Sequence, residues 1–390
     1  MVVGSNATCA PSLAAVTYRW AYCACGDINA DAAVTTDAFN SALGRYLPGR
    51  EGGAVGANGL FSTGAAFNIG GTLWLAGDGG LAFGSSGNTV ARDLWVNGTL
   101  ANGGSLAVGG DAFVNGDIQG INSIGGVLYA PRLASISSTT FADGGMVRGP
   151  VVVPTPCDCA TNQRIDVAGI VQYGVTHNDN ALIGLSPDAL NNRANRLDLP
   201  CGRYYLSTIT SGSAVTIAVH GKTAIFVGGD ISLGSAFQAT IDPQAELDLF
   251  IGGTLAVDAP VSIGSTEVPA QSRIYIASTT AVGFGGAAVI AGNFYFPQAQ
   301  LGGGSSKEIF GSVFSGSFAS GAPLTVHYDE AILGAASECG GPDAGASSCS
   351  SCRDCGNQAC VNGTCGACIS DADCCAPLHC QAGVCRGTFR

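Results

Sequence analysis

Residues 93–98 read Asp-Leu-Trp-Val-Asn-Gly, and residues 111–116 read Asp-Ala-Phe-Val-Asn-Gly. The two units share an opening Asp, an aromatic residue and a closing Val-Asn-Gly, and they begin 18 residues apart. Apolar residues alternate inside each unit, which is typical of short β-strands. A repeat of this length corresponds to one coil of a solenoid.

The same pattern extends on both sides of these two units. It occurs in the stretches 67–75, 126–129, 224–233, 247–257, 273–276, 288–296 and 309–316. A single coil of short strands cannot bury its inward side chains, whereas stacked coils pair their backbones and bury a continuous apolar column. We therefore predict an all-β fold, a parallel β-solenoid (β-helix). Strands joined by hairpins in a barrel or a sandwich are the structural alternative.

Composition divides the chain into three parts. Residues 1–50 differ in composition from the repeats and are predicted to form an N-terminal cap, with the β-solenoid at 51–337. A proline-rich and then polar stretch at about 150–205 is predicted to be an insertion in the solenoid. Residues 338–390 are predicted to be a linker and a small disulfide-rich C-terminal module.

Charge and hydropathy exclude two classes of partner. Only 11% of residues are charged and the net charge is −12, with the few cations scattered singly, so no basic stripe is available to bind nucleic acid. No apolar run approaches the roughly 18 residues that a membrane-spanning helix needs. We expect a protein that binds no nucleic acid and does not span a membrane.

The 17 cysteines indicate an oxidising compartment. We therefore expect an extracellular or cell-surface location in the outer envelope. Residues 1–6 show neither the charged nor the apolar segment of a signal peptide, so we expect that signal to be missing from this sequence. The six early cysteines suffice for two bridges in the body and one pair for the N-terminal cap, although their connectivity stays open. These six are Cys9, Cys23, Cys25, Cys157, Cys159 and Cys201.

The cysteines of the tail admit two interpretations. Few residues between them are apolar, so disulfides or a metal must hold this segment together. Adjacent cysteines fit one tetrahedral zinc ion poorly, and we favour disulfides over a zinc site. The disulfide candidates are Cys349, Cys352, Cys355, Cys360, Cys365, Cys368, Cys374, Cys375, Cys380 and Cys385. Cys339 is then the unpaired candidate in an odd total.

Residues with possible chemistry are sparse. Asp27, Asn29 and Asp31 partly match an oxygen-rich calcium loop, but Ala32 and Ala38 stand where that loop has Gly and a carboxylate. Calcium is therefore a weak candidate, and we predict no other cofactor and no catalytic residues. We interpret the recurring Asp of the coils as a residue that caps its own turn.

Three stretches carry a resemblance to a known family. These are 23–27 (Cys-Ala-Cys-Gly-Asp), 35–39 (Thr-Thr-Asp-Ala-Phe) and 326–333, which contains His327, Tyr328 and Asp329. Together with the coils they resemble an uncharacterised β-solenoid domain family found in PilX-like pilus-assembly proteins and bacterial surface lipoproteins. The resemblance covers roughly residues 20–335 and implies export and a structural or adhesive role. From the residues, we interpret the His-Tyr-Asp motif as the closure of the last coil's edge.

We predict a secreted or cell-surface structural and adhesive protein without enzymatic activity. Its expected partner is an unidentified component of the cell envelope or extracellular matrix. One alternative is a carbohydrate-active enzyme or carbohydrate-binding protein on a β-helix scaffold. Another is a protein-binding module that acts through the Cys-rich tail, which resembles the Cys-rich extensions of such surface proteins.

Overall fold

The protein is a parallel β-solenoid of about 13 turns. The computed structural model describes residues 14, 17–284, 288–335, 359–361, 364–366, 368–374, 379–381 and 384–386. All strand pairings in the body are parallel and join equivalent strands of successive turns. The solenoid prediction is confirmed, and the hairpin-linked barrel or sandwich is wrong.

Three faces run along the solenoid. Face A consists of β1 (Tyr22–Ala24), β4 (Val55–Ala57), β7 (Leu73–Leu75), β10 (Leu94–Asn97), β13 (Ala112–Asn115), β15 (Leu128–Ala130), β17 (Met146–Arg148), β19 (Gly202–Leu206), β22 (Lys222–Val227), β25 (Glu246–Ile251) and β28 (Ser272–Ile276). Face B consists of β2 (Ile28–Ala30), β5 (Phe61–Thr63), β8 (Leu81–Phe83), β11 (Leu100–Asn102), β20 (Ile209–Ser211), β23 (Ile231–Leu233), β26 (Leu255–Val257) and β29 (Val282–Phe284).

Face C closes the triangular turn. It consists of β3 (Val34–Phe39), β6 (Phe67–Ile69), β9 (Asn88–Val90), β12 (Ser105–Val108), β14 (Ile121–Ile124), β16 (Thr140–Ala142), β18 (Arg196–Leu199), β21 (Val215–Val219), β24 (Phe237–Ile241), β27 (Val261–Ile263) and β32 (Leu324–Asp329). Two long strands, β30 (Ala288–Gly302) and β31 (Lys307–Ser320), each bend through a whole turn and contribute to all three faces.

The core lies inside the coil because side chains alternate across each strand. In β7, Leu73 and Leu75 point inward and are fully buried, whereas Trp74 between them points outward. Register then stacks Leu73 on Leu94, and Leu94 on Ala112, so each turn buries the apolar side chains of the next. Stacking of turns, rather than any single turn, therefore provides the burial that stabilises the fold.

The recurring Asp joins one turn to the next. The Oδ1 atom of Asp93 accepts a hydrogen bond from Asp111 N at 2.9 Å, and that of Asp111 accepts one from Val127 N at 2.8 Å. Each bond reaches the backbone of the following coil. The prediction that the Asp side chain bonds to the backbone of its own turn is therefore wrong. The Asp93 carboxylate also explains why a glycine precedes Asp111, because a Cβ at Gly110 would lie 2.3 Å from Asp93 Oδ1.

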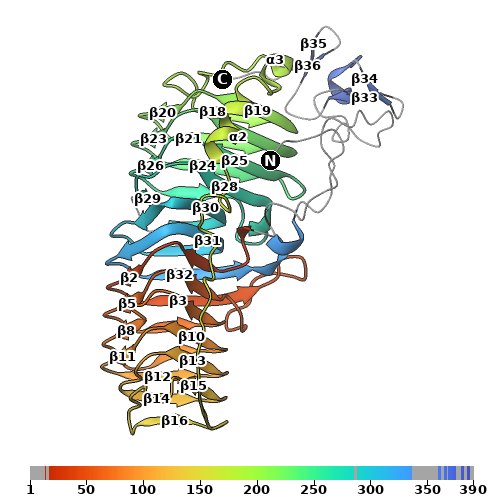
Figure 1. Ribbon diagram of the computed structural model, residues 1–390. Coiled ribbons are helices and arrows are strands. Elements are labelled where there is room, and N and C mark those ends of the chain that lie inside the picture. The colour runs from red at the N-terminus through yellow and green to blue at the C-terminus, as the bar shows by residue number, and fades with distance from the viewer. Residues whose placement is uncertain are drawn as a thin grey trace.

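The chain fills the solenoid in two blocks whose spatial order is the reverse of their sequence order. The lower block, residues 22–148, winds from the middle of the molecule to one end, and the upper block, residues 167–334, winds from the other end back to the middle (Figure 1). The blocks meet at a seam where β1 and β2 pair with β31 and β3 pairs with β32. The resulting solenoid is continuous.

This path corrects two predicted boundaries. Residues 1–50 were expected to cap the solenoid, but β1, β2 and β3 form an interior turn with neighbours on both sides. The stretch at about 150–205 was expected to be an insertion, but β18 and the start of β19 belong to the first turn of the upper block. Both blocks share one strand pattern, so their composition carries no information on which edges pair.

A strap of residues 149–164 connects the two blocks along face A (Figure 1). It leads into α2 (Val167–Gly174), which packs on β19, β22 and β25, and then into α3 (Asn180–Ile183). The one-turn helices η1 (Pro269–Gln271) and η2 (Glu330–Gly334) contact each other beside the seam. The strap is therefore the return path that the block order requires.

The described part of the tail forms two antiparallel hairpins. They are β33 (Ala359–Val361) with β34 (Thr364–Gly366), and β35 (His379–Gln381) with β36 (Val384–Arg386), with η4 (Asp371–Asp373) between them. A disulfide joins Cys368 to Cys380. β36 lies against α3 at the upper end of the solenoid (Figure 1).

Candidate functional site

A column of outward-facing side chains runs the whole length of face A. Strand register places one residue of each turn in it, and all but Cys23, Gly56 and Val147 are aromatic. From the upper end the column is Tyr205, Phe226, Phe250, Tyr275, Tyr295, Phe314, Cys23, Gly56, Trp74, Trp95, Phe113, Tyr129 and Val147.

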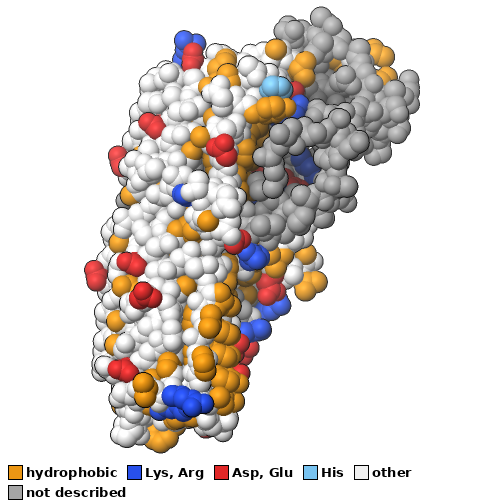
Figure 2. All heavy atoms as spheres, in the orientation of Figure 1, with side chains coloured by type: hydrophobic (Ala, Val, Ile, Leu, Met, Phe, Trp, Pro, Cys, Tyr) orange, Lys and Arg blue, Asp and Glu red, His pale blue; other side chains and the backbone are white. Residues whose placement is uncertain are grey.

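The aromatic rings of the lower block stack on one another. The ring centroids of Trp74 and Trp95 are 4.8 Å apart, those of Trp95 and Phe113 are 3.7 Å apart, and those of Phe113 and Tyr129 are 4.6 Å apart. Hydrophobic side chains accordingly gather along one edge of the lower block (Figure 2). Because the ring faces cover each other, the column stabilises neighbouring turns and leaves only ring edges for other contacts.

The strap crosses this column at its two non-aromatic positions next to the seam. A Cβ at Gly56 would lie 3.0 Å from the Cβ of Pro156, so only glycine leaves room for the strap there. The Trp74 Nε1 atom donates a hydrogen bond of 2.7 Å to the Pro154 carbonyl. At the upper side of the seam, Ile165 N, directly after the strap, donates one of 2.9 Å to the Tyr295 hydroxyl. The strap is thus attached to both blocks.

Two disulfides fasten the strap to β1 and the residue that follows it. Cys23 is bonded to Cys157 and Cys25 to Cys159, each pair 134 residues apart in sequence. Asn58 adds a reciprocal pair of hydrogen bonds, from its Nδ2 to the Cys157 carbonyl and from Cys157 N to its Oδ1. We call these five residues the clamp. Since Cys23 pairs with Phe314 across the seam, the clamp lies at the joint between the blocks.

A histidine bridges the seam on face C. His327 Nδ1 is 2.6 Å from Asp37 Oδ1, and its Nε2 is 3.2 Å from Glu308 Oε1. The Tyr46 hydroxyl donates to the other oxygen of Asp37 at 2.6 Å, and the rings of Tyr46 and Phe310 pack on the imidazole. Burial alone would lower the pKa of His327, but the bonds and charges of Asp37 and Glu308 outweigh it and raise that pKa.

The neighbouring Tyr328 and Asp329 are also structural. The Tyr328 hydroxyl donates to the Tyr18 carbonyl at 2.7 Å. The fully buried carboxylate of Asp329 accepts from Ser41 N at 2.8 Å, from Ser41 Oγ at 2.7 Å and from Ala270 N at 3.2 Å. The His-Tyr-Asp motif was predicted to close an edge, which is wrong: β32 pairs on both sides and the motif joins the blocks.

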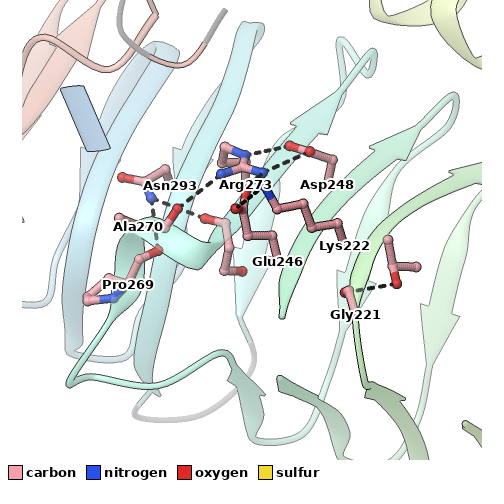
Figure 3. A network of polar contacts seen from close by, with 10 residues as sticks. Gly221, Lys222, Glu246, Asp248, Pro269, Ala270, Arg273 and Asn293 are labelled. Carbon is pink, nitrogen blue, oxygen red and sulfur yellow. Dashed lines mark hydrogen bonds and ion pairs between the residues drawn. The ribbon is translucent and has the colours of Figure 1, made fainter. Parts of the chain in front are cut away.

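A buried ion network stabilises the upper block (Figure 3). The Arg273 side chain is only 3% exposed, and its guanidinium contacts Asp248 at 2.6 Å and Glu246 at 2.7 Å on the adjacent strand. Burial would raise the pKa of Glu246, but Arg273 and then Lys222 outweigh it and lower that pKa. Because the charges balance and each carboxylate already has a partner, removing one member of the network would leave an unpaired buried charge.

The weak calcium candidates lie along one short stretch of chain at β2. Asp27 Oδ1 accepts from Leu60 N at 3.0 Å, in the same role as the corner Asp of other turns. Asn29 lies on β2 and Asp31 follows it, so the three residues run along extended backbone rather than around a loop. Within the described residues, no group of three or more His, Cys, Asp or Glu side chains is placed to hold a metal ion.

The disulfide candidates divide into observed and undescribed ones. Besides the clamp, Cys368–Cys380 is formed and Cys374 is disulfide-bonded, which excludes a zinc site that uses Cys368. Cys201 is half-buried just before β19. Backbone pairing sets Cys360 opposite Cys365 and Cys380 opposite Cys385. The remaining candidates lie outside the described residues: Cys9, Cys349, Cys352, Cys355 and Cys375, together with Cys339.

Sequence reasoning missed the strap, the seam histidine and Arg273. Two signals were available for the first: the recurrent aromatic of the coil unit, and the equal spacing of Cys23 with Cys25 and of Cys157 with Cys159. No comparable signal marked His327 as the partner of Asp37, because the two are 290 residues apart.

The fold and these contacts define a disulfide-clamped parallel β-solenoid. A family described as a domain of unknown function (DUF7305) matches residues 167–334, which correspond to the upper block from the start of α2 to the end of η2. No curated protein and no solved structure matches the chain. Among the described residues, no helix has both the length and the apolar character needed to cross a membrane.

Proposed function

We propose that this chain is an exported, non-catalytic structural and adhesive protein of the cell surface or the extracellular space. The clamp carries the exported location in this proposal, because disulfides such as the two at the joint of the blocks form and persist in oxidising compartments and are rare in the cytosol. The disulfide between Cys368 and Cys380 adds to this argument. Its partner would be an unidentified component of the cell envelope or extracellular matrix.

The polar contacts of the body favour a scaffold over an enzyme. A glycosidase needs two carboxyl groups that flank one bond of the substrate in a groove. Here the best-buried acidic groups are committed to structure: Asp329 to three donors of the seam, Asp37 to His327 and Tyr46. The ring faces of the aromatic column are likewise occupied by each other.

The compartment can be tested by differential alkylation. Free thiols are alkylated in intact cells that express the full chain with its native upstream region, and peptides are then mapped before and after reduction. We expect Cys23, Cys25, Cys157 and Cys159 to be protected until reduction and the protein to be labelled by an impermeant surface reagent. Free clamp thiols and no surface labelling would contradict the proposal, as would turnover of polysaccharide substrates.

Carbohydrate binding is a second candidate, favoured by a hollow on face B. A shallow hollow of about 350 Å³ is lined by small and uncharged polar residues of β5, β8 and β11, among them Ser62, Ala82, Ala101 and Asn102. Hydroxyl and amide groups over a floor of small side chains could bind the hydroxyls of an extended neutral glycan. A glycan array with wild type and Ala82→Trp tests this candidate: binding that the tryptophan abolishes supports it, and absence of binding contradicts it.

A further inference from the structure

At the lower end of the solenoid, no described segment covers the last turn, and we call this the bare end. Its last turn consists of β15, β16, β17 and a single bridge at Ile136. Among the described strands, β16 pairs only with β14 and β17 only with β15, on one side each. The outer side of β17 presents backbone N–H and C=O groups that no other described strand pairs, and such groups are a template for another strand. On β16 part of the outer side is already satisfied, because Thr140 N donates to the Ser137 carbonyl and Gly145 N donates to the Ala142 carbonyl.

Large apolar side chains surround this edge. Leu133 is 99% exposed and Phe141 is 64% exposed, and Met146 and Val147 on β17 are exposed as well. Single exposed apolar residues are ordinary, but here four of them lie on one terminal turn. Figure 2 shows hydrophobic side chains next to basic ones at this end of the molecule.

The upper end has the opposite construction. There the backbone of β19 is satisfied by a cap: Asn180 Nδ2 donates to the Tyr205 carbonyl at 2.7 Å, and Tyr205 N donates to Asn180 Oδ1 at 2.9 Å. Asp179 adds two bonds to Arg203, one from its own N to the carbonyl and one from Arg203 N to Oδ2. On face B, Asn192 N donates to the Thr210 carbonyl and Thr210 N donates to the Leu190 carbonyl, whereas β18 of face C pairs only with β21 among the described strands. A strand that extended face A at this end would displace α3.

Neither described neighbour of the body covers the lower end. Among the described residues before β1, Tyr18 contacts Tyr275 in the upper block. The described tail lies at the upper end, where β36 contacts α3. Within the described residues, the bare end is thus left open to another molecule.

We propose that the bare end binds the bare end of a second copy, forming a closed two-fold dimer. The seam shows within one chain that an open block end of this fold is covered by another block end through strand pairing. Because α3 covers face A and residues 190–192 cover face B at the upper end, head-to-tail stacking would displace both segments, whereas two lower ends can meet without displacing any described residue. Arg132, Arg148 and Asp143 give each end mixed charge, so two copies do not strongly repel.

A two-fold axis across this joint sets the strands of the two copies antiparallel, unlike those of the body. The contact would bury Phe141 and Val147 and satisfy the outer edge of β17. The dimer would be a rod of twice the solenoid length with a cap at each end. This inference concerns assembly and does not depend on the proposed role at the cell surface.

The test is the molar mass of the full chain in solution, measured by light scattering on a sizing column and by sedimentation over a range of micromolar concentrations. We expect twice the chain mass for wild type and the single chain mass for Phe141→Asp and Leu133→Asp. Leu182→Asp is the matched control, because Leu182 is an exposed apolar residue of α3 at the capped end. It should remain a dimer.

Hydrogen exchange provides a second readout that does not require a variant. In the dimer, amides of β17 should exchange more slowly as concentration rises, while those of α3 should not change. A wild-type chain that is monomeric at all concentrations overturns the proposal. So does a dimer that persists in both lower-end variants, or one that dissociates only in Leu182→Asp.

Discussion

The two blocks of this solenoid share one fold but differ in how they are stabilised. Turns of the upper block are long, with 24 residues from Phe226 to Phe250 and 25 from there to Tyr275, whereas Trp95 to Phe113 takes 18 and Phe113 to Tyr129 takes 16. The upper block has a cap, a packed helix and a buried arginine. The lower block has three- and four-residue strands on face A and a bare end.

This difference implies that the lower block depends on the upper block for its stability more than the upper block depends on the lower. The upper block buries its own end, so it can retain its structure without the lower block, apart from the edge that it presents at the seam. The lower block has an open edge at both ends unless the seam covers one of them. In a solenoid, stability is a sum over turns and their interfaces, so the lower block should lose structure first when the seam is weakened.

The largest expected effect comes from removing the clamp. Replacing Cys23, Cys25, Cys157 and Cys159 by Ala should lower the free energy of unfolding by about 4 kcal/mol, because a disulfide that closes a loop of more than 100 residues strongly restricts the unfolded chain. Removing one bridge should cost much less, since the remaining bridge closes almost the same loop. Urea unfolding followed by tryptophan fluorescence measures both, and it reports Trp74 and Trp95 of the lower block together with Trp20, which packs against Trp74.

The tail supplies the matched control for the clamp. Replacing Cys368 and Cys380 by Ala removes a disulfide whose sequence separation is only 12, and it should leave the unfolding of the body unchanged. A single-bridge variant as unstable as the four-fold variant would show that the two clamp disulfides do not act on the same loop. A tail variant that destabilises the lower block would contradict the dependence of that block on the seam.

A smaller effect should be confined to the upper block. Arg273→Met should cost about 3 kcal/mol, because it leaves Asp248 and Glu246 without their buried partner. Lys222→Met is the matched control: Lys222 is 3.5 Å from the same Glu246 but its side chain is 58% exposed, so its loss should cost less than about 1 kcal/mol. Hydrogen exchange should locate the first change near β25 and β28. Equal costs for both variants would refute a special role for burial.

Much of the fold could be predicted from the local sequence. The Asp-x-aromatic-Val-Asn-Gly unit predicts the position of a strand, the position of a corner and the length of a coil. It does so because Asp93 and Asp111 bond to the next turn and Trp95 stacks on Phe113. The corner glycines follow from the same geometry. These are interactions between adjacent turns, so a repeat in the sequence encodes them directly.

The spatial order of the two blocks could not be predicted from the sequence in this way. Pairing of β3 with β32 joins residues about 290 positions apart, and both edges carry the same alternation as every interior strand. The seam is held together by individual polar groups, such as Asp329 and Ser41. Their pairing cannot be predicted from the sequence, because neither belongs to a repeating pattern. For the same reason the motif at 327–329 was assigned to an edge that does not exist.

The smallest expected effect is a pH dependence of the seam. The pKa of His327 is raised in the folded protein, so the contact of protonated His327 with Asp37 and Glu308 contributes its full stability below the unfolded pKa, about 6.5. That contribution is lost as the pH rises through the folded value. Stability of wild type should therefore fall from mildly acidic to mildly alkaline pH, and His327→Gln should flatten this slope. Urea midpoints measured across that range provide the test.

His220 is the internal control that ties this prediction to the comparison of the blocks. It also lies between two carboxylates of neighbouring turns, 3.0 Å from Asp242 and 3.4 Å from Asp198, but within the upper block and with 24% of its side chain exposed. If the seam limits the stability of the lower block, His327→Gln should change the slope reported by Trp74 and Trp95, and His220→Gln should not. Equal changes from both variants would mean that the seam is no weaker than the turns inside a block.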